Sequence, residues 1–279
     1  MKWISEISVE AECERISAPT KNPKFARIAD LSDAEIRGIQ TEIQDFPTEL
    51  GHYDIIDMTA GVTEIKMPLN LEKFYFPSLV WLKAIRFKSN LNLDYAQFSF
   101  GVKFNRSNFE EDVSARGANF GSHSSFQDCV FNKCSCFQSA KFGWAHFHSV
   151  NFEDRCYFEQ ATFTNIASFM NSRFTNSGKF RDAKFHNTSY FDVAKASIPA
   201  VQLDFTVLNL SAIPLFFGRE VHGNTDWTDV ELPSAKQQAV RPRGRLEDDK
   251  RANEQLRIKC GALGKVEDAH LFFRREMDL

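Results

Sequence analysis

Large apolar residues, most of them phenylalanine, recur through the middle of the chain at steps that alternate between five and six residues. The pattern breaks its alternation at one step. Its anchors are Phe76, Leu82, Phe87, Leu93, Phe98, Phe104, Phe109, Ala115, Phe120, Phe126, Phe131, Phe137, Phe142, Phe147, Phe152, Phe158, Phe163, Phe169, Phe174, Phe180, Phe185 and Phe191. A fixed period of this kind predicts one small unit stacked on copies of itself, each burying its apolar face against its neighbours. The sequence therefore predicts a solenoid.

The spacing also indicates strands rather than helices. An amphipathic helix repeats its apolar positions at three and four residues, which the steps of five and six do not fit. From Phe98 onward a small or modest side chain precedes each anchor by two residues, as in Ala96, Ser124, Cys129, Cys156 and Ala161, whereas the partners in the earlier coils are larger. Residues two apart on a strand share a face, so each anchor and its small partner should both point inward.

These residues resemble the pentapeptide-repeat proteins, whose unit is a small residue, a polar one, a central Leu or Phe and two polar positions. Ala118-Asn119-Phe120, Ala140-Lys141-Phe142, Ala161-Thr162-Phe163 and Ala183-Lys184-Phe185 match this unit. The resemblance covers roughly half of the chain. It implies an all-β solenoid, a right-handed quadrilateral β-helix with four units per coil. The alternating steps predict coils of about 22 residues.

Four regions are expected along the chain. Ser32 and Glu35 form a capping-box pattern that predicts a helix ending before Pro47, which would cap the solenoid. A Pro- and Gly-containing stretch after the repeats predicts an irregular linker, and its cluster of Arg241, Arg243 and Arg245 is interpreted as a solvated face. The expected regions are a helical cap region at 1–54, the β-helix at 55–217, a linker at 218–245 and a helical hairpin at 246–279.

The hairpin is expected to consist of helices over 248–260 and 266–277, joined by a turn at 261–264. Its ending, from Ala269 to Met277, resembles a segment that follows the repeats in many bacterial pentapeptide-repeat proteins, where transmembrane helices often come next. Such helices do not follow here. The chain is thus expected to be either a short soluble member of the family or a fragment.

Composition places the chain among ordinary soluble proteins, with a formal net charge of -3 in 279 residues. No apolar stretch reaches the roughly 18 residues of a membrane span. Six scattered cysteines without a signal-peptide pattern do not form a secreted disulfide framework, which indicates a reducing compartment. A cytoplasmic location is expected, with peripheral attachment to a membrane as the alternative.

Catalytic motifs are missing from the sequence. It has no phosphate-binding glycine loop, no Gly-x-Ser-x-Gly elbow and no His-Glu-x-x-His, so we expect neither an enzyme nor a cofactor site. A zinc site is an alternative suggested by three cysteines and three histidines that lie close in sequence. The repeat pattern argues against a zinc site, because Cys129 and Cys156 fall on inward positions. A buried, unreactive thiol is a sufficient explanation for a cysteine at such a position. The residues of this alternative are Cys129, Cys134, Cys136, His123, His146 and His148.

The broken step, from Phe142 to Phe147, shortens one coil by a residue. If Phe147 points inward, His146 and His148 point outward and Trp144 lies at or near a corner, with His123 about one coil away. An irregular coil that displays an aromatic and two imidazoles is a candidate partner-binding site. The alternative is a tolerated deletion with solvated side chains.

Two classes of function are consistent with this reading of the sequence. The first is a noncatalytic scaffold for protein–protein interaction, and the second is a sensor or adaptor arm of a membrane-associated or effector-linked protein. Well-understood members of the family mimic duplex DNA and inhibit type II topoisomerases, which requires a strongly negative rod. Residues 98–195 carry 9 acids and 11 bases, which disfavours that mechanism and direct nucleic-acid binding alike. A homodimer formed through a solenoid end is also expected.

Overall fold

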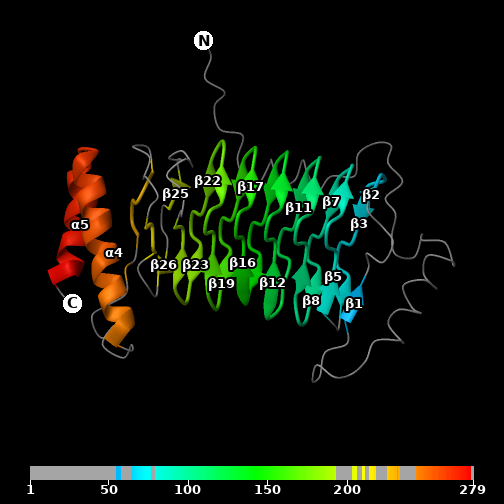
Figure 1. Cartoon of the computed structure of the whole chain (residues 1–279), viewed down its shortest axis with the longest axis horizontal. Helices are drawn as coiled ribbons and strands as arrows, with labels where there is room; N and C mark the ends of the chain where they lie inside the picture. The colour runs from blue at the N-terminus through cyan, green and yellow to red at the C-terminus, as the bar shows by residue number, and fades with distance from the viewer. Residues whose placement is uncertain are drawn as a thin grey trace, which may run out of the picture.

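The predicted solenoid is present. The structure, a computed structural model, describes residues 55–57, 64–76, 79–192, 203–205, 209–210, 214–217, 225–230, 232 and 243–277. Its central part is a parallel β-solenoid in which each turn passes through four ladders in the same order, so that consecutive strands belong to different sheets. Successive turns stack side by side along the long axis of the molecule (Figure 1). The N-terminal cap predicted over 1–54 lies outside the described residues.

Two of the four ladders are named here after residues on their outward sides. We call the outward side of the first ladder the Trp144 face; its strands are β1 (Ile55–Asp57), β5 (Leu79–Trp81), β9 (Val102–Lys103), β12 (His123–Ser125), β16 (Trp144–His146), β20 (Ala167–Ser168) and β24 (Ser189–Tyr190). We call the outward side of the second the Cys136 face; its strands are β3 (Leu69–Asn70), β7 (Leu91–Asn92), β11 (Val113–Ser114), β14 (Ser135–Cys136), β18 (Cys156–Tyr157), β22 (Gly178–Lys179) and β25 (Leu203–Asp204).

The other two ladders separate these faces. One contains β2 (Glu64–Ile65), β6 (Arg86–Phe87), β10 (Asn108–Phe109), β13 (Val130–Phe131), β17 (Asn151–Phe152) and β21 (Arg173–Phe174). The other contains β4 (Tyr75–Phe76), β8 (Gln97–Phe98), β15 (Lys141–Phe142), β19 (Thr162–Phe163), β23 (Lys184–Phe185) and β26 (Asn209–Leu210), with Asn119 bridging β8 to β15. In each turn the chain passes first through the ladder of the Trp144 face and then through the ladder that contains β2. It continues through the ladder of the Cys136 face and then through the ladder that contains β4.

The alternation of five and six residues arises from two kinds of corner. In most five-residue steps the anchor carbonyl accepts a hydrogen bond from the N–H three residues on, as in Phe104 O with Ser107 N at 3.0 Å. The third residue of this tight turn has a positive φ, as in a type II turn. Such residues recur about every 11 positions and are mostly not glycine: Lys73, Ala84, Tyr95, Arg106, Gly117, Asp128, Ser139, Ser149, Gln160, Asn171 and Asp182. In the described six-residue corners this turn bond is not formed.

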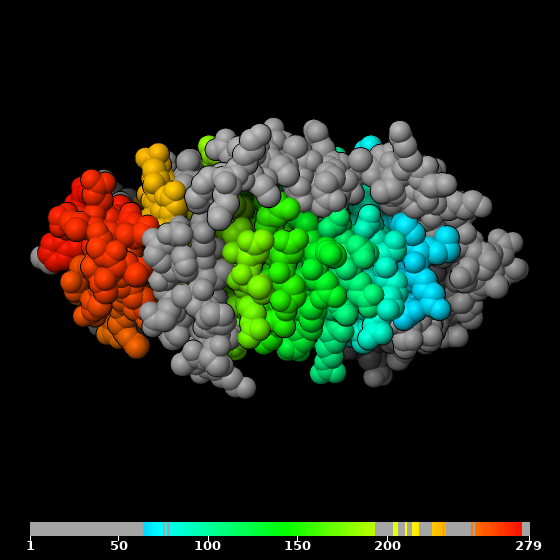
Figure 2. All heavy atoms as spheres, turned by 90° about the horizontal axis from the view of Figure 1, so that it is seen from above, coloured from blue at the N-terminus to red at the C-terminus, as the bar shows by residue number. Residues whose placement is uncertain are grey.

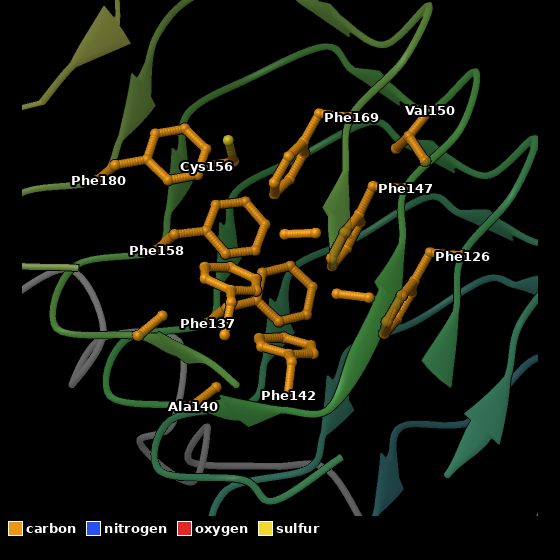
Figure 3. Close-up of a cluster of buried hydrophobic side chains, with 14 of the residues drawn as sticks. Phe126, Phe137, Ala140, Phe142, Phe147, Val150, Cys156, Phe158, Phe169 and Phe180 are labelled. Atoms are coloured by element: carbon orange, nitrogen blue, oxygen red, sulfur yellow. The ribbon is translucent and has the colours of Figure 1, made fainter. Parts of the chain in front are cut away.

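Four columns of anchor side chains fill the interior. The rings of Phe126, Phe147 and Phe169 stack in one column, with centroids 4.7 and 4.9 Å apart and nearly parallel planes. Phe137, Phe158 and Phe180 form the neighbouring column, and rings of different columns meet edge-on (Figure 3). Parallel displaced and edge-to-face contacts are the geometries that aromatic pairs prefer. The small inward partners, such as Ala140 and Cys156, leave the space that these rings occupy.

The solenoid continues into the stretch predicted as a linker at 218–245. Phe205 packs against Phe180 of the preceding coil, and Trp227 packs against Phe205 with ring centroids 4.9 Å apart. Asp226 also pairs with Asp204 as a parallel bridge. The regular spacing of the anchors is interrupted by an insertion and then resumes. The resumed anchors, Phe205 and Trp227, cover the rings of the preceding coils.

Two helices close this end of the rod (Figures 1 and 2). The helix α4 (Arg243–Ala262) begins several residues before the predicted hairpin, and α5 (Val266–Met277) lies where the second helix was expected. Phe272 of α5 meets the Trp227 ring edge-on at 5.2 Å, and Lys265 Nζ donates to the carbonyl of Thr225 at 2.6 Å. The helical pair is therefore a lid on the apolar end of the solenoid.

Candidate interaction site on the Trp144 face

The shortened coil lies at the corner that leads into the Trp144 face. His123 pairs with Trp144 and Ala145 pairs with Ala167, and the first of these pairs is separated by one residue fewer than the second. The missing residue is absorbed in the corner, because the rings of Phe126 and Phe147 remain parallel to within 2°. The inner lattice is thus undisturbed, and the change falls on the outward surface.

Glycines make this corner possible. The Gly143 N–H donates to the carbonyl of Gly121 at 2.8 Å, and the Trp144 N–H donates to that of Ser122 at 2.7 Å. A Cβ added at Gly143 would lie 2.5 Å from the Ser122 carbonyl oxygen, and one at Gly121 would lie 1.9 Å from that of Phe98. Real Cβ atoms do not approach backbone oxygens so closely, so these positions require glycine.

The shortened coil places an aromatic and three imidazoles side by side. The indole of Trp144 lies parallel to the His123 ring, with centroids 6.0 Å apart and 3° between planes. His146 follows on the same strand, 6.4 Å from the Trp144 ring, and His148 lies 5.9 Å from His146. His148 Nε2 also forms a hydrogen bond with the Ser168 hydroxyl. We call Trp144, His123, His146 and His148 the imidazole cluster.

Burial and mutual repulsion favour the neutral form of two of these imidazoles. Desolvation lowers the pKa of His146 below its ordinary value, and the nearby His148, His123 and Lys103 lower it further. Desolvation also lowers the pKa of His148, which Asp128 partly opposes. Both rings are half-buried. At neutral pH they therefore present hydrogen-bonding but uncharged edges.

From β5 to β24 the Trp144 face displays no acidic side chain among its described strand residues. The outward side chains of these strands are Leu79, Trp81, Lys103, His123, Ser125, Trp144, His146, Ser168 and Tyr190. On the neighbouring ladder the outward residues include both Glu64 and Arg86. This part of the Trp144 face is thus aromatic and neutral to basic, unlike its neighbour.

Sequence reasoning placed Trp144, His146 and His148 together on the outside, and the structure places them so. It also indicated His123 one coil away, and the structure pairs His123 with Trp144. It missed Lys103 and Ser168, which flank the cluster from β9 and β20. Counting one regular coil onward from His146 would have found Ser168, because strands one full coil apart are neighbours.

The residues of the zinc alternative are distributed over separate parts of the solenoid. Cys129 points into the core, where burial raises its pKa to about 12, and its thiol donates to the Phe104 carbonyl at 3.1 Å. Cys134 and Cys136 belong to the Cys136 face, whereas the histidines belong to the Trp144 face. Within the described part of the chain, no group of three or more His, Cys, Asp or Glu residues is placed to hold a metal ion.

Comparison with known proteins identifies the repeat. Residues 137–184 match the family model described as "Pentapeptide repeats (9 copies)". Residues 137–184 are therefore a pentapeptide-repeat segment. No curated protein and no solved structure matches it. The matched pentapeptide-repeat segment includes Trp144, His146 and His148, so the candidate site is a local modification of the family lattice.

The two C-terminal helices are α4 and α5. Among the residues that the structure describes, no helix combines the length and the apolar composition that crossing a bilayer requires.

Proposed function

We propose that this pentapeptide-repeat protein is a noncatalytic scaffold that binds another protein through the Trp144 face. The imidazole cluster forms the centre of the binding surface, and Lys103 and Ser168 flank it. The observation that carries the proposal is the outward face described above, in which the fold holds an indole and three imidazoles side by side without a neighbouring outward carboxylate on the described strands from β5 to β24.

The chemistry of this face favours one kind of partner. Tryptophan and tyrosine are enriched among the residues that dominate interface energies, because they bury a large rigid surface and keep a polar tip. Lys103 adds a positive charge, and neutral imidazoles accept or donate hydrogen bonds without the cost of burying a charge. A protein surface with an apolar side chain over Trp144 and a carboxylate near Lys103 fits this arrangement.

The rigidity of the fold supports a binding role over a catalytic one. The cluster is mounted on strands β12 and β16, whose backbones are fixed by parallel pairing to both neighbours. Preorganised side chains lose little conformational entropy when a partner binds. The balanced charge of residues 98–195 gives no support to mimicry of duplex DNA or to direct nucleic-acid binding.

We also infer a right-handed coil with a four-sided cross-section. Four ladders visited in a constant order support four sides, and parallel strands joined by crossovers are right-handed in nearly all known cases. The flat sides of such a rod would present each ladder as one continuous surface. The regional division that the sequence predicts becomes part of this proposal, with the solenoid extended to include Trp227.

The test is an affinity pull-down from the native host with the full chain as bait. The variant carries Trp144→Ala, His146→Ala and His148→Ala, and a matched control carries Asn151→Ala and Glu153→Ala on the adjacent ladder. We expect one partner to be retained by the wild type and the control and lost by the variant. Binding that is equal in all three baits would contradict the proposal.

A second candidate function is an adaptor arm whose helical end docks a membrane component or an effector. Large apolar side chains on α4, on α5 and between them are exposed, among them Ile258, Leu263, Val266 and Phe273, at 55, 43, 59 and 45%. Exposed apolar groups at one end of a rod suit a protein contact, including a homodimer formed end to end. In the same pull-down this function predicts partners that the triple variant still retains and that Phe273→Asp loses.

A further inference from the structure

His146 and His148 lie on either side of the inward Phe147 at the edge of the Trp144 face. Phe147 is fully buried in its ring column, so both of its neighbours along the extended chain point outward. Backbone pairing fixes this stretch. The Phe147 N–H donates to the Ser168 carbonyl at 2.7 Å, and the His148 carbonyl accepts from the Asp128 N–H at 2.9 Å. The fold thus holds two imidazoles one residue apart on the same side of an extended backbone.

The separation of these two rings is close to that of two ligands on one metal ion. Their centroids lie 5.9 Å apart, with 84° between the ring planes. For two imidazoles on one tetrahedral zinc ion, Zn–N distances of about 2.0–2.1 Å place the ring centroids about 5 Å apart. Rotation about the side-chain torsions closes the difference of about 1 Å while the backbone stays in place. The pair is therefore nearly assembled by the fold itself.

Ser168 on β20 orients one of the two imidazoles. It is 3% exposed, and its hydroxyl forms a hydrogen bond with Nε2 of His148. When this hydroxyl accepts the Nε2–H, the proton is fixed at Nε2 and Nδ1 presents a lone pair. Metal-binding histidines usually donate their second ring N–H to an oxygen in this way, which fixes the tautomer and the ring orientation. Within the described part of the chain His146 has no hydrogen-bond partner at either ring nitrogen, so it can also offer a lone pair.

The donor atoms determine which ions fit this pair. Imidazole nitrogens suit Zn²⁺, Ni²⁺ and Cu²⁺, whereas Mg²⁺ and Ca²⁺ require several oxygen ligands. The pair differs from the closed zinc site considered above, because among the described residues no third His, Cys, Asp or Glu is placed to complete a group of three. Two imidazoles leave the other positions of a tetrahedral ion open to water or to a donor of another molecule.

We propose that His146 and His148 form an open, two-imidazole site for a divalent transition-metal ion such as Zn²⁺. Nδ1 of His148 and a ring nitrogen of His146 bind the ion, and Ser168 holds the His148 imidazole in the required tautomer. An ion held there adds a positive charge and exchangeable ligand positions to the Trp144 face. The site goes beyond the proposed scaffold function, because binding of the ion requires no protein partner.

The test is a calorimetric titration of the full chain, prepared without a histidine tag, with Zn²⁺ alone at neutral pH. We expect a single site and a higher midpoint of thermal unfolding when zinc is added, because an ion that binds only the folded chain stabilises it. His146→Gln and His148→Gln should each abolish both effects. Ser168→Ala should weaken zinc binding by about tenfold through loss of the orienting hydrogen bond. The matched Ser125→Ala, on the other strand beside His146, should leave zinc binding unchanged.

A second control removes two exposed imidazoles elsewhere on the molecule. The His186→Gln, His270→Gln double variant should bind zinc as the wild type does. Absence of binding to the wild type, or binding that persists in His146→Gln or His148→Gln, would overturn the two-imidazole site. Loss of binding in the double variant would overturn it as well, by placing the ion at other histidines. Circular dichroism of each variant shows that a lost titration does not come from unfolding.

Discussion

The Trp144 face and the Cys136 face are equivalent in their backbone and differ in what they display. Apart from the shortened step before β16, each follows a six-residue corner, and each ends in a five-residue corner with a positive φ, such as Asp128 for one and Ser139 for the other. Each turns a small residue and a ring inward, as in Ala145 with Phe147 and Ser135 with Phe137. Outside, one carries the imidazole cluster and the other carries buried Cys136 and Tyr157.

This difference separates two sets of positions. Inward positions accept a narrow choice of side chains because the ring columns leave little space, and they determine the fold. Outward positions are free of that constraint, so the outward side chains of one ladder can be exposed and those of another buried. The effect of a substitution on stability should therefore depend more on whether the side chain points inward or outward than on its position along the chain.

The largest expected effect tests the inward set. Phe137 contacts rings in all the neighbouring columns, namely Phe126, Phe131 and Phe142. Phe137→Ala should lower the free energy of unfolding by about 3–5 kcal/mol. The loss combines the transfer free energy of the removed ring with the free-energy cost of the cavity it leaves. The outward Trp144→Ala should cost less than about 1 kcal/mol. Urea unfolding followed by circular dichroism measures both, and similar losses would show that the division by direction is wrong.

The next effect tests Gly121, in the corner that leads into the Trp144 face one coil before the shortened step. Gly121 and Gly117 both have a φ of 62°, but an added Cβ would meet a backbone carbonyl at the first and the exposed Tyr95 ring at the second. Gly121→Ala should cost about 2–4 kcal/mol, from the left-handed conformation and the clash together. Gly117→Ala should cost only about 1–2 kcal/mol. Thermal unfolding separates them, and an equal cost would mean that the corner has room to relax.

Much of this arrangement could be predicted from the sequence, because the repeat positions follow from their spacing along the chain. The anchors and their small partners follow from period and alternation, and the break at Phe142 to Phe147 located the irregular coil. The corner geometry was less accessible. The positive φ positions hold lysine, alanine, tyrosine and arginine as well as asparagine and aspartate, so no residue type marks them. The hydrogen-bonded turn imposes the conformation despite its cost.

Other parts could not be predicted because they depend on contacts across long separations. Trp227 was assigned to a linker because an insertion after Phe191 shifts the count, so that Phe205 packs on Phe180 across a longer stretch of chain than a regular coil contains. The burial of the Cys136 face also leaves no periodic signal, because outward residues follow no rule of size. The position at which the solenoid is closed is determined by the free-energy cost of exposing a large ring to water. A repeating pattern does not determine it.

A smaller effect tests the tight corners that both faces share. Ala84 is exposed and has a φ of 55°, where a Cβ costs about 1–2 kcal/mol. Ala84→Gly should raise the free energy of unfolding by up to about 1 kcal/mol, since the extra entropy of glycine in the unfolded chain offsets part of the relief. The matched Ala96→Gly, at a buried inward position, should lower it by a similar amount. Denaturant midpoints would show opposite signs, and a loss at both positions would contradict the strain argument.

The smallest effect concerns protonation of the imidazole cluster. The pKa values of His146 and His148 are lowered in the folded protein, so below the ordinary histidine value of about 6.5 the unfolded chain binds more protons. Their contribution to stability is therefore complete above that pH and is lost as the pH falls towards the lowered pKa values. Urea midpoints between about pH 7.5 and pH 5 should fall more steeply for the wild type than for a His146→Gln, His148→Gln variant. Parallel curves for the wild type and the double variant would mean that these imidazoles are as hydrated as those of the unfolded chain, and the Trp144 face would lose its claim to a desolvated centre.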